Sequence, residues 1–156
     1  MMAIARAPSA AAPPLFRPQS VLFACSENAV RSAMAEALTR KMLGRTVYVD
    51  SAGVRCGTLN PFTTAVLLEV GIDRSRHRPK TFDDLVETSF DAVVTLSPEA
   101  HHRALDFVRN MAVDVHYWPT ADPTATEGSR ATVMEAFRLV RDALDARLRA
   151  TFGIAG

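Results

Sequence analysis

The chain has 156 residues, of which 48% are hydrophobic and 22% are charged, and its formal net charge at pH 7 is +1. This length fits one domain with one core, and the small net charge gives no electrostatic footprint for nucleic acid or for a membrane surface. No apolar run approaches the roughly 18 residues of a membrane span, and the two cysteines do not indicate a disulfide framework. We therefore expect a monomeric cytoplasmic protein that binds neither nucleic acid nor membranes.

Residues 1–18 differ in composition from the rest of the chain, because they are rich in alanine and proline and lack a compact apolar centre. This pattern predicts a flexible leader ahead of one domain at 19–156. The alternative is a targeting segment, which is disfavoured because prolines interrupt the stretch and the apolar core of a signal peptide is missing.

Four short apolar runs predict buried strands, and helical patterns separate them. The expected strands are Val21–Cys25, Thr46–Asp50, Ala92–Leu96 and Val113–Trp118. Helix starts are marked by a capping residue before a favoured first turn, at Asn60 before Pro61, at Thr81 with Asp84 three positions later, and at Ser97 before Pro98. The last helix is expected from about Ser129 to Ala150, with apolar side chains along one face.

This alternation predicts an α/β fold with an open, doubly wound, four-stranded parallel sheet and helices on both faces. In such sheets ligands bind outside the carboxyl ends of the strands, where the strand order reverses. Functional residues are therefore expected in four loops, at Cys25–Arg31, Ser51–Gly57, Ser97–Pro98 and Pro119–Gly128.

The loop after the first strand carries the clearest chemical signal. Cys25 ends an apolar run, and Arg31 follows six positions later, where a helical pattern begins. The residues between them are Ser26, Glu27, Asn28, Ala29 and Val30, and Ser32 follows directly. Backbone N–H groups that turn inward here would form a phosphate-binding loop at a helix N-terminus. In that setting Cys25 is expected to be a reactive thiolate, and the alternative is a cysteine that only packs at a strand end.

A second candidate residue follows the fourth strand. A thiolate that attacks a phosphate monoester needs an acid beside the leaving oxygen. Asp122 is the candidate, because it should lie at the same sheet edge as Cys25. The alternative is a helix cap before Pro123, and the loop at Cys25 favours the acid.

The remaining titratable residues show no spacing typical of a metal site. The four histidines, at positions 77, 101, 102 and 116, are expected in surface or capping roles. Cys56 is expected to be a passive loop residue, and its alternative is a thiol that shields or resolves an oxidised Cys25. The chemistry requires neither a metal nor a cofactor.

Further matches complete an ordered set: the run Cys25–Ser32 with Met34–Ala37, then Ser51–Gly53, Gly71–Asp73 with Ser75 and His77, Phe90–Asp91, and Asp122–Pro123. In these residues the chain resembles the low-molecular-weight protein tyrosine phosphatases and the arsenate reductases that share their fold. The similarity covers nearly everything from Ser20 to the final helix.

The resemblance implies a cysteine-dependent phosphatase that acts on a phosphorylated protein, above all on phosphotyrosine, or on a small phosphate ester. It makes Cys25 the nucleophile, Arg31 the bidentate ligand of the phosphoryl oxygens, Ser32 the hydroxyl that holds the thiolate, Asn28 the residue that shapes the loop, and Asp122 the general acid.

Three positions depart from the family's pattern. Glu27 stands where many of its phosphatases have glycine, which puts a carboxylate near the mouth of an anion site. Val30 replaces a second loop cysteine, so a disulfide within the loop cannot protect Cys25. Thr124–Thr126 replaces aromatic residues that sandwich the ring of phosphotyrosine, which leaves tyrosine specificity open.

Two alternatives to a phosphatase follow. An arsenate reductase would use the same loop, but its thioredoxin-linked form needs a cysteine pair after the third strand, and Thr95–Asn110 contains none. A form that uses a small thiol remains. The second alternative, motivated by Glu27 and the missing aromatic residues, is a catalytically weak module that binds oxyanions or phosphoproteins.

Overall fold

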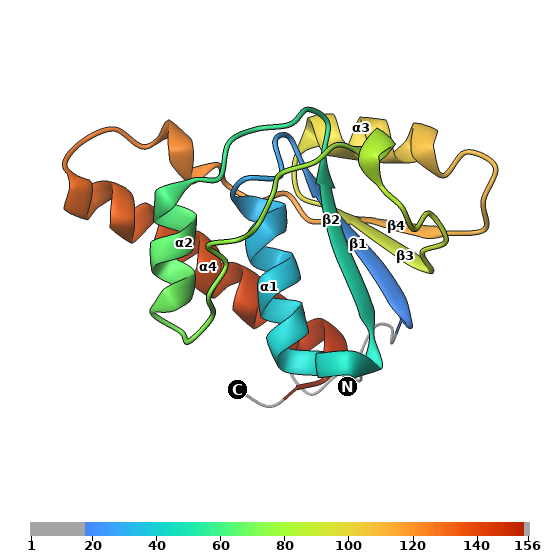
Figure 1. Ribbon diagram of the computed structural model, residues 1–156, viewed down its shortest axis with the longest axis horizontal. Helices are drawn as coiled ribbons and strands as arrows, with labels where there is room; N and C mark the ends of the chain where they lie inside the picture. Colours follow the sequence, from blue (N-terminus) through green and yellow to red (C-terminus); the bar gives the residue numbers. More distant parts are fainter. Residues whose placement is uncertain (1–17, 155–156) are drawn as a thin grey trace, which may run out of the picture.

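The computed structural model describes residues 18–154 and contains the predicted parallel sheet (Figure 1). Except for Pro18, which is buried, the predicted leader lies outside the described residues. The strands are β1 (Ser20–Cys25), β2 (Tyr48–Gly53), β3 (Ala92–Thr95) and β4 (Asp114–Tyr117). The α-helices are α1 (Arg31–Leu43), α2 (Pro61–Leu68), α3 (Pro98–Phe107) and α4 (Arg130–Phe152). Three single turns complete the set: η3 (Gly44–Thr46), η4 (Phe82–Asp84) and η5 (Pro123–Ala125).

The strand order is β2-β1-β3-β4, and every neighbouring pair is parallel. The chain leaves β1 toward β2 on one side and later returns to β3 on the other, so the strand order reverses beside β1. The carboxyl ends of β1 and β2 point to the top of Figure 1, and the loop after β1 lies at this edge. The predicted fold class is therefore confirmed.

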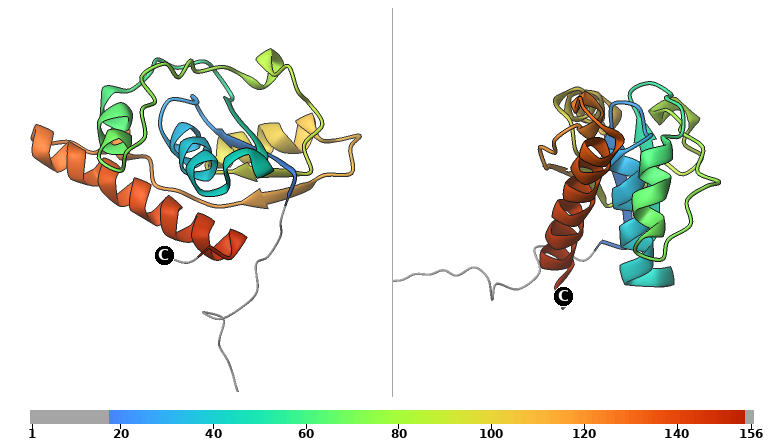
Figure 2. Two further views of the ribbon diagram at one scale, coloured as in Figure 1. Left: turned by 60° about the horizontal axis from the view of Figure 1, so that its bottom comes forward. Right: turned by 90° about the vertical axis from the view of Figure 1, so that its left-hand side faces the viewer.

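Alternating side chains of β1 enter two separate cores. Val21 and Phe23 pack with α1, α2 and α4 on one face of the sheet, whereas Leu22 and Ala24 pack with α3 on the other. The views in Figure 2 show α4 running along the same side of the molecule as α1 and α2. Because β1 is buried on both faces, it reads as one continuous apolar run.

Three of the four strands agree with their predicted bounds to within one residue at each end, but two elements differ by more. β2 begins two residues later than expected and continues to Gly53, because Ser51–Gly53 pairs in register with Phe23–Cys25. The buried Ser51 hydroxyl has hydrogen-bond partners, so a polar residue is tolerated inside the sheet. The capping box at Thr81 and Asp84 forms, but it starts only the turn η4, because the backbone is extended again at Leu85.

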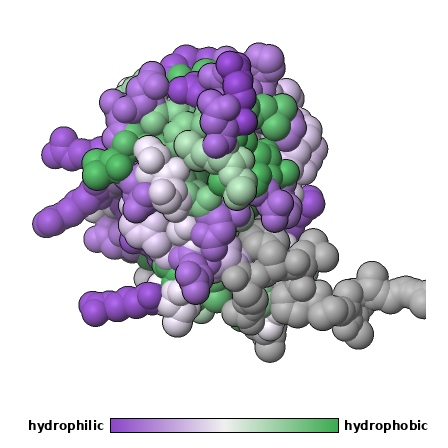
Figure 3. All heavy atoms as spheres, turned by 90° about the vertical axis from the view of Figure 1, so that its right-hand side faces the viewer, coloured by the Kyte–Doolittle hydropathy of each residue, from purple (hydrophilic) through white to green (hydrophobic). Residues whose placement is uncertain are grey.

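The molecular surface is mixed in character. Figure 3 shows a hydrophobic area set among hydrophilic residues on the side that forms the right-hand edge of Figure 1. Large exposed hydrophobic side chains include Leu68, Val86 and Leu139. Within residues 18–154, every helix is too short or too polar to cross a bilayer.

Candidate active site

A small cavity opens at the carboxyl edge of the sheet, between the loops that follow β1, β2 and β4. It is lined by Cys25, Ser26, Glu27, Ala29, Val30, Arg31, Arg55, Asp122 and Thr124. Its volume of about 120 Å³ lies well below the roughly 300–1,000 Å³ of pockets for drug-sized ligands. The cavity is therefore suited to a small group such as one tetrahedral oxyanion, and three of the four predicted loops line it.

The thiol of Cys25 lies at the bottom of this cavity and is 2% exposed. Its Sγ atom is 3.0 Å from the hydroxyl of Ser32 and accepts the backbone N–H of Ser32 at 3.4 Å. Ser32 is the second residue of α1, so this N–H lies at the positive end of the helix dipole. Both donors stabilise a thiolate more than a neutral thiol.

Asn28 shapes the loop around the thiol. It has a φ of 58°, and among the described residues it is the one non-glycine residue in the left-handed region, which asparagine tolerates better than most residues. Its buried side-chain NH₂ donates to the hydroxyls of Ser32 and Ser51, and its Oδ1 accepts the backbone N–H of Lys80. The strained conformation is therefore held by three side-chain hydrogen bonds.

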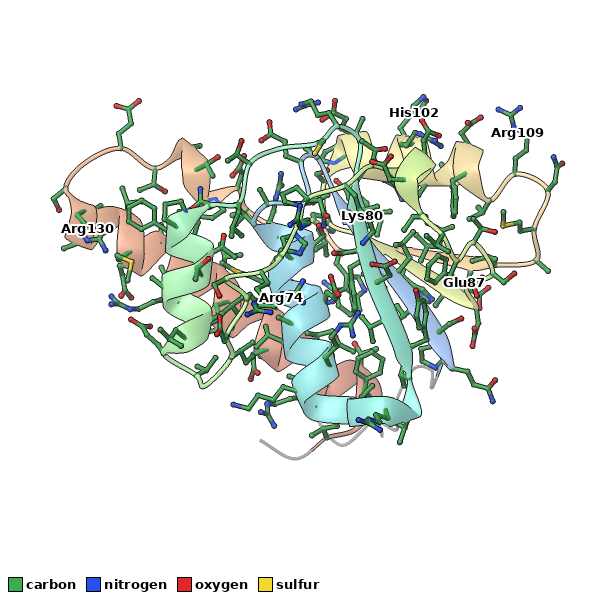
Figure 4. All side chains as sticks on the ribbon, viewed as in Figure 1. Arg74, Lys80, Glu87, His102, Arg109 and Arg130 are labelled. Atoms are coloured by element: carbon green, nitrogen blue, oxygen red, sulfur yellow. The ribbon has the colours of Figure 1, made fainter. Side chains whose placement is uncertain are left out.

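A buried carboxylate lies behind the loop. Burial alone would raise the pKa of Glu36, but Arg74, the hydroxyl of Ser51 and Arg40 together lower it below its ordinary value of 4.5. Arg74 approaches Glu36 to 3.0 Å and Arg40 approaches it to 2.8 Å. Figure 4 shows Arg74 and Lys80 reaching across α1 and β2 from the segment that follows α2. Glu36 is ionised at neutral pH and can only accept hydrogen bonds.

This charge state sets the direction of the hydrogen bonds beneath the cavity. Ser51 must donate its proton to Glu36, so its oxygen accepts from Asn28. The other N–H of Asn28 donates to the oxygen of Ser32, which leaves the Ser32 proton for Cys25. We call Cys25, Asn28, Ser32, Ser51 and Glu36 the floor network. Its members are all buried, and each hydrogen bond orients the next.

Arg31 and Asp122 form the wall opposite β2. Arg31 donates from Nη1 to the backbone carbonyl of Thr120 at 3.1 Å, and its Nη2 lies 3.9 Å from Oδ2 of Asp122. The other oxygen of Asp122 accepts the backbone N–H and the hydroxyl of Thr124, so Asp122 does cap η5. The cap uses Oδ1 and leaves Oδ2 at the cavity. The cap interpretation is therefore confirmed, and the position of Oδ2 leaves the acid role as a prediction.

A charged group lies at the mouth of the cavity. Arg55 bonds Glu99 at 2.7 Å and lies 3.5 Å from Glu27, and the three side chains are about half exposed. We call Glu27, Arg55 and Glu99 the rim triad. Arg55 keeps the pKa of Glu99 below its ordinary value of 4.5. The expected carboxylate at the mouth is thus present, and its charge is partly balanced by Arg55, which lies in the predicted loop Ser51–Gly57 but had been given no role of its own.

His77 has a more specific place than the predicted surface or capping role, because its half-buried ring has a polar partner at each nitrogen. Its Nε2 is 2.7 Å from the carbonyl oxygen of Asn28, and its Nδ1 is 2.8 Å from Nη2 of Arg74. A guanidinium only donates, so Nδ1 accepts and Nε2 carries the proton that goes to the loop carbonyl. Burial lowers the pKa of His77, which favours this neutral form. His77 therefore positions the loop.

Cys56 does not take part in the cavity. Its exposed thiol donates to the carbonyl of Pro79 at 3.1 Å, and it is not among the lining residues. Within residues 18–154, no group of three or more histidine, cysteine or acidic side chains could hold a metal ion.

The predicted site residues divide into two sets. The lining includes Cys25, Arg31, Asp122 and most of the loop, whereas Asn28 and Ser32 lie beneath it. Sequence reasoning gave no individual role to Glu36, Ser51 or Arg55, and it expected His77 in a surface or capping role. Glu36, Ser51 and His77 stand within the motifs of the family resemblance, which could have pointed to them. Arg55 lies in the predicted loop Ser51–Gly57, but no motif singles it out.

The fold and the cavity define a class of α/β proteins that hold a cysteine in an anion-binding loop after the first strand. Within this class, the chain belongs to the low molecular weight phosphotyrosine protein phosphatase family, whose sequence model matches residues 20–153. Members of this family are enzymes that act on phosphate esters or reduce arsenate.

Two relatives are named for arsenate reduction, and a solved structure with the same fold is named as a tyrosine phosphatase. The chain is 35% identical over 136 residues to an arsenate reductase of Halalkalibacterium halodurans, covering 87% of this chain and 96% of the relative. It is 32% identical over 129 residues to an arsenate reductase of Bacillus subtilis, covering 83% and 91%. A tyrosine phosphatase structure from Erwinia amylovora shares the fold, with a TM-score of 0.71 at 17% identity over 88% of this chain and 93% of that one.

Proposed function

We propose that the protein hydrolyses phosphate monoesters through a phosphocysteine at Cys25. One observation carries this proposal: the Cys25 thiol, the Arg31 guanidinium and the free oxygen of Asp122 face a single cavity suited to one phosphoryl group. The natural ester is a phosphorylated protein or a small molecule. Thr124 stands beside Asp122 where an aromatic wall would favour phosphotyrosine, so the proposal does not depend on tyrosine specificity.

In the first step Sγ of Cys25 attacks phosphorus while the bond to the ester oxygen breaks. Arg31 and the loop N–H groups stabilise the negative charge on the three equatorial oxygens. Arg31 is suited to this role because the Thr120 carbonyl fixes one edge of its guanidinium. Asp122, in its protonated form, gives its proton to the leaving oxygen.

In the second step water attacks the phosphocysteine. Asp122, now a carboxylate, removes a proton from this water, and the S–P bond breaks to release phosphate and the thiolate. Ser32 stabilises the departing Cys25 thiolate, because its hydroxyl and its backbone N–H both lie within hydrogen-bond distance of Sγ. Neither step needs a metal ion.

The test is release of p-nitrophenol from p-nitrophenyl phosphate by the reduced protein in the presence of a chelator. Cys25→Ser should lower the rate by more than about a thousandfold, because loss of a nucleophile removes the covalent route. Asp122→Asn, which preserves the cap at Thr124, should retain phosphocysteine formation with this good leaving group and slow its hydrolysis. No hydrolysis by the unmodified protein would contradict the proposal.

A second candidate is arsenate reduction, which the names of the two curated relatives favour. The Cys25 thiolate would displace water from arsenate and form an S–As(V) bond. A thiol must then attack Sγ, so that a disulfide forms and arsenic leaves with the electron pair as As(III). The thiol of Cys56 is bonded to Pro79 outside the cavity. A small external thiol would therefore supply this step, and a second one would restore Cys25.

One experiment separates the two candidates. Arsenite formation is followed with glutathione, with another small thiol and with none, alongside phosphate release from the ester. A reductase gives turnover of arsenate that depends on one thiol, whereas a phosphatase hydrolyses the ester with arsenate acting only as a competitive inhibitor. Binding of oxyanions without either reaction would instead identify a binding module.

A further inference from the structure

We propose that Glu27 selects substrates that carry a positive charge beside the phosphorylated group, such as a phosphopeptide with a lysine or arginine next to the phosphorylated residue. This inference rests on the proposed phosphatase function and adds a substrate class to it. The preference is set at the rim triad, outside the part of the site where the chemistry takes place.

The size of the cavity places the substrate's neighbouring groups at the rim. The cavity is suited to about one phosphoryl group, so atoms beyond the ester oxygen lie at its mouth. The lining of the cavity includes the half-exposed side chains of Glu27, Arg55 and Asp122. A residue that flanks the phosphorylated one can therefore contact Glu27, whose side chain is exposed at this opening.

The charges at this mouth do not cancel. Within the rim triad one guanidinium stands between two carboxylates, whereas Asp122 lies 3.9 Å from Nη2 of Arg31, so the excess negative charge lies at the rim triad. Arg55 is committed mainly to Glu99, at 2.7 Å, and only weakly to Glu27, at 3.5 Å. The carboxylate of Glu27 therefore has bonding capacity left for a cation from the substrate, whereas an anion would have to separate Arg55 from Glu99.

The backbone holds Glu27 at this position while its carboxylate stays accessible. Its carbonyl accepts the N–H of Gly57 at 3.0 Å, and a Cβ on Gly57 would lie 2.8 Å from the Cβ of Glu27. The absence of a side chain at Gly57 lets the Glu27 stem pack against this backbone. The side chain of Glu27 is nevertheless 54% exposed, so it can meet a bound peptide without a rearrangement of the loop.

The test uses three phosphotyrosine tripeptides that differ only in the two flanking residues: lysine, glutamine or glutamate. Each competes with p-nitrophenyl phosphate, and its inhibition constant is measured whether or not it is hydrolysed. At low salt we expect the lysine peptide to bind about fivefold more tightly than the glutamate peptide, a range typical of one exposed ion pair. The ratio should approach one at 1 M salt, where the Debye length is about 3 Å.

Three variants assign the effect. Glu27→Gln should reduce the fivefold ratio to less than about twofold, and Arg55→Gln should increase it by removing the competing cation. Glu87→Gln is the matched control, because Glu87 is an exposed glutamate whose side chain bonds Ser89 near the amino end of the sheet (Figure 4). It should leave the ratio unchanged.

The failure of this inference is distinguishable from failure of the proposed function. If the protein hydrolyses p-nitrophenyl phosphate but the three peptides compete equally, or the glutamate peptide binds best, Glu27 does not select a cation. If the ratio of the inhibition constants is unchanged in Glu27→Gln, another group on the protein interacts with the flanking charge and the assignment to Glu27 is wrong. If p-nitrophenyl phosphate itself is not hydrolysed, the phosphatase proposal fails first.

Discussion

The floor network and the rim triad are both built from charged and polar side chains, yet they are held in opposite ways. Every member of the floor network is buried, and its hydrogen bonds run from the Asn28 amide through Ser32 to the Cys25 thiol and through Ser51 to the Glu36 carboxylate. The rim triad is about half exposed, and its contacts with Arg55 are open to salt and solvent. The floor therefore fixes the geometry on which the chemistry depends, and the rim can change without disturbing it.

Replacement of one arginine by lysine at the cavity wall and of one at the rim should give the largest difference in catalytic efficiency between two variants. Arg31→Lys keeps the positive charge but loses the planar guanidinium, which can contact two phosphoryl oxygens in a bidentate manner. It also loses the hydrogen bond to the Thr120 carbonyl. We expect kcat/KM for p-nitrophenyl phosphate to fall by about a hundredfold, the scale for loss of one transition-state donor. Arg55→Lys should change it by less than about threefold. Similar losses in both variants would show that the rim takes part in the chemistry.

Asn28 tests the floor through stability. Asn28→Ala removes three side-chain hydrogen bonds and leaves a Cβ-bearing residue at a φ of 58°. The free energy of unfolding, measured in urea, should fall by about 3 kcal/mol. Asn28→Gly loses the same hydrogen bonds without the backbone strain. Its free energy of unfolding should therefore be about 1 kcal/mol higher than that of the alanine variant. Glu27→Ala at the rim should cost less than about 0.5 kcal/mol.

Equal stability of Asn28→Ala and Glu27→Ala would contradict this account of the floor. Equal stability of Asn28→Ala and Asn28→Gly would contradict only the argument from backbone strain, because both variants lose the same hydrogen bonds.

Glu36 predicts how the floor responds to acid. Its folded-state pKa is lowered below 4.5, so its carboxylate stabilises the fold above the unfolded-state pKa, and this contribution is lost as the pH falls through the folded-state pKa. Glu36→Gln should therefore be less stable than the unmodified protein at pH 6, and the difference should narrow below pH 4.5. Urea unfolding of the two proteins at several pH values measures the stability difference at pH 6 and its decrease at lower pH. A difference that does not change with pH would assign the loss to packing alone.

Cys56 should show the smallest effect, because its thiol is bonded to Pro79 outside the cavity. Cys56→Ser should leave ester hydrolysis within about 1.5-fold of the unmodified rate, consistent with an exposed substitution. Inactivation by hydrogen peroxide and recovery with a reducing thiol should also be unchanged. Faster irreversible inactivation of the variant would instead show that Cys56 resolves an oxidised Cys25.

The floor and the rim also differed in how far the sequence revealed them. The loop from Cys25 to Ser32 is contiguous, and a strand before it with a helix after it is visible in the apolar pattern. Asp122 could be placed because parallel strands deliver their following loops to one edge. The fold class was predictable because apolar strand runs alternate with helical patterns along the chain.

Residues that act through contacts distant in sequence were not predictable in the same way. Ser51 was assigned to the loop after the second strand, but it lies within β2, where its buried hydroxyl is satisfied by Asn28 and Glu36. The role of His77 depends on a carbonyl 49 residues away in the sequence. Arg55 acquires its role only once β2 has placed it beside the loop. None of these partnerships leaves a periodic pattern in the chain.

The bond from Arg31 to the carbonyl of Thr120 joins groups 89 residues apart, and this separation has a consequence for biosynthesis. Chains emerge from the ribosome N-terminal end first. The cysteine loop is therefore exposed well before the segment that anchors its arginine and supplies its aspartate. An unfinished or C-terminally truncated chain holds the thiol but not the completed wall, so catalytic competence arrives only with the last third of the protein and turnover reports that folding is complete.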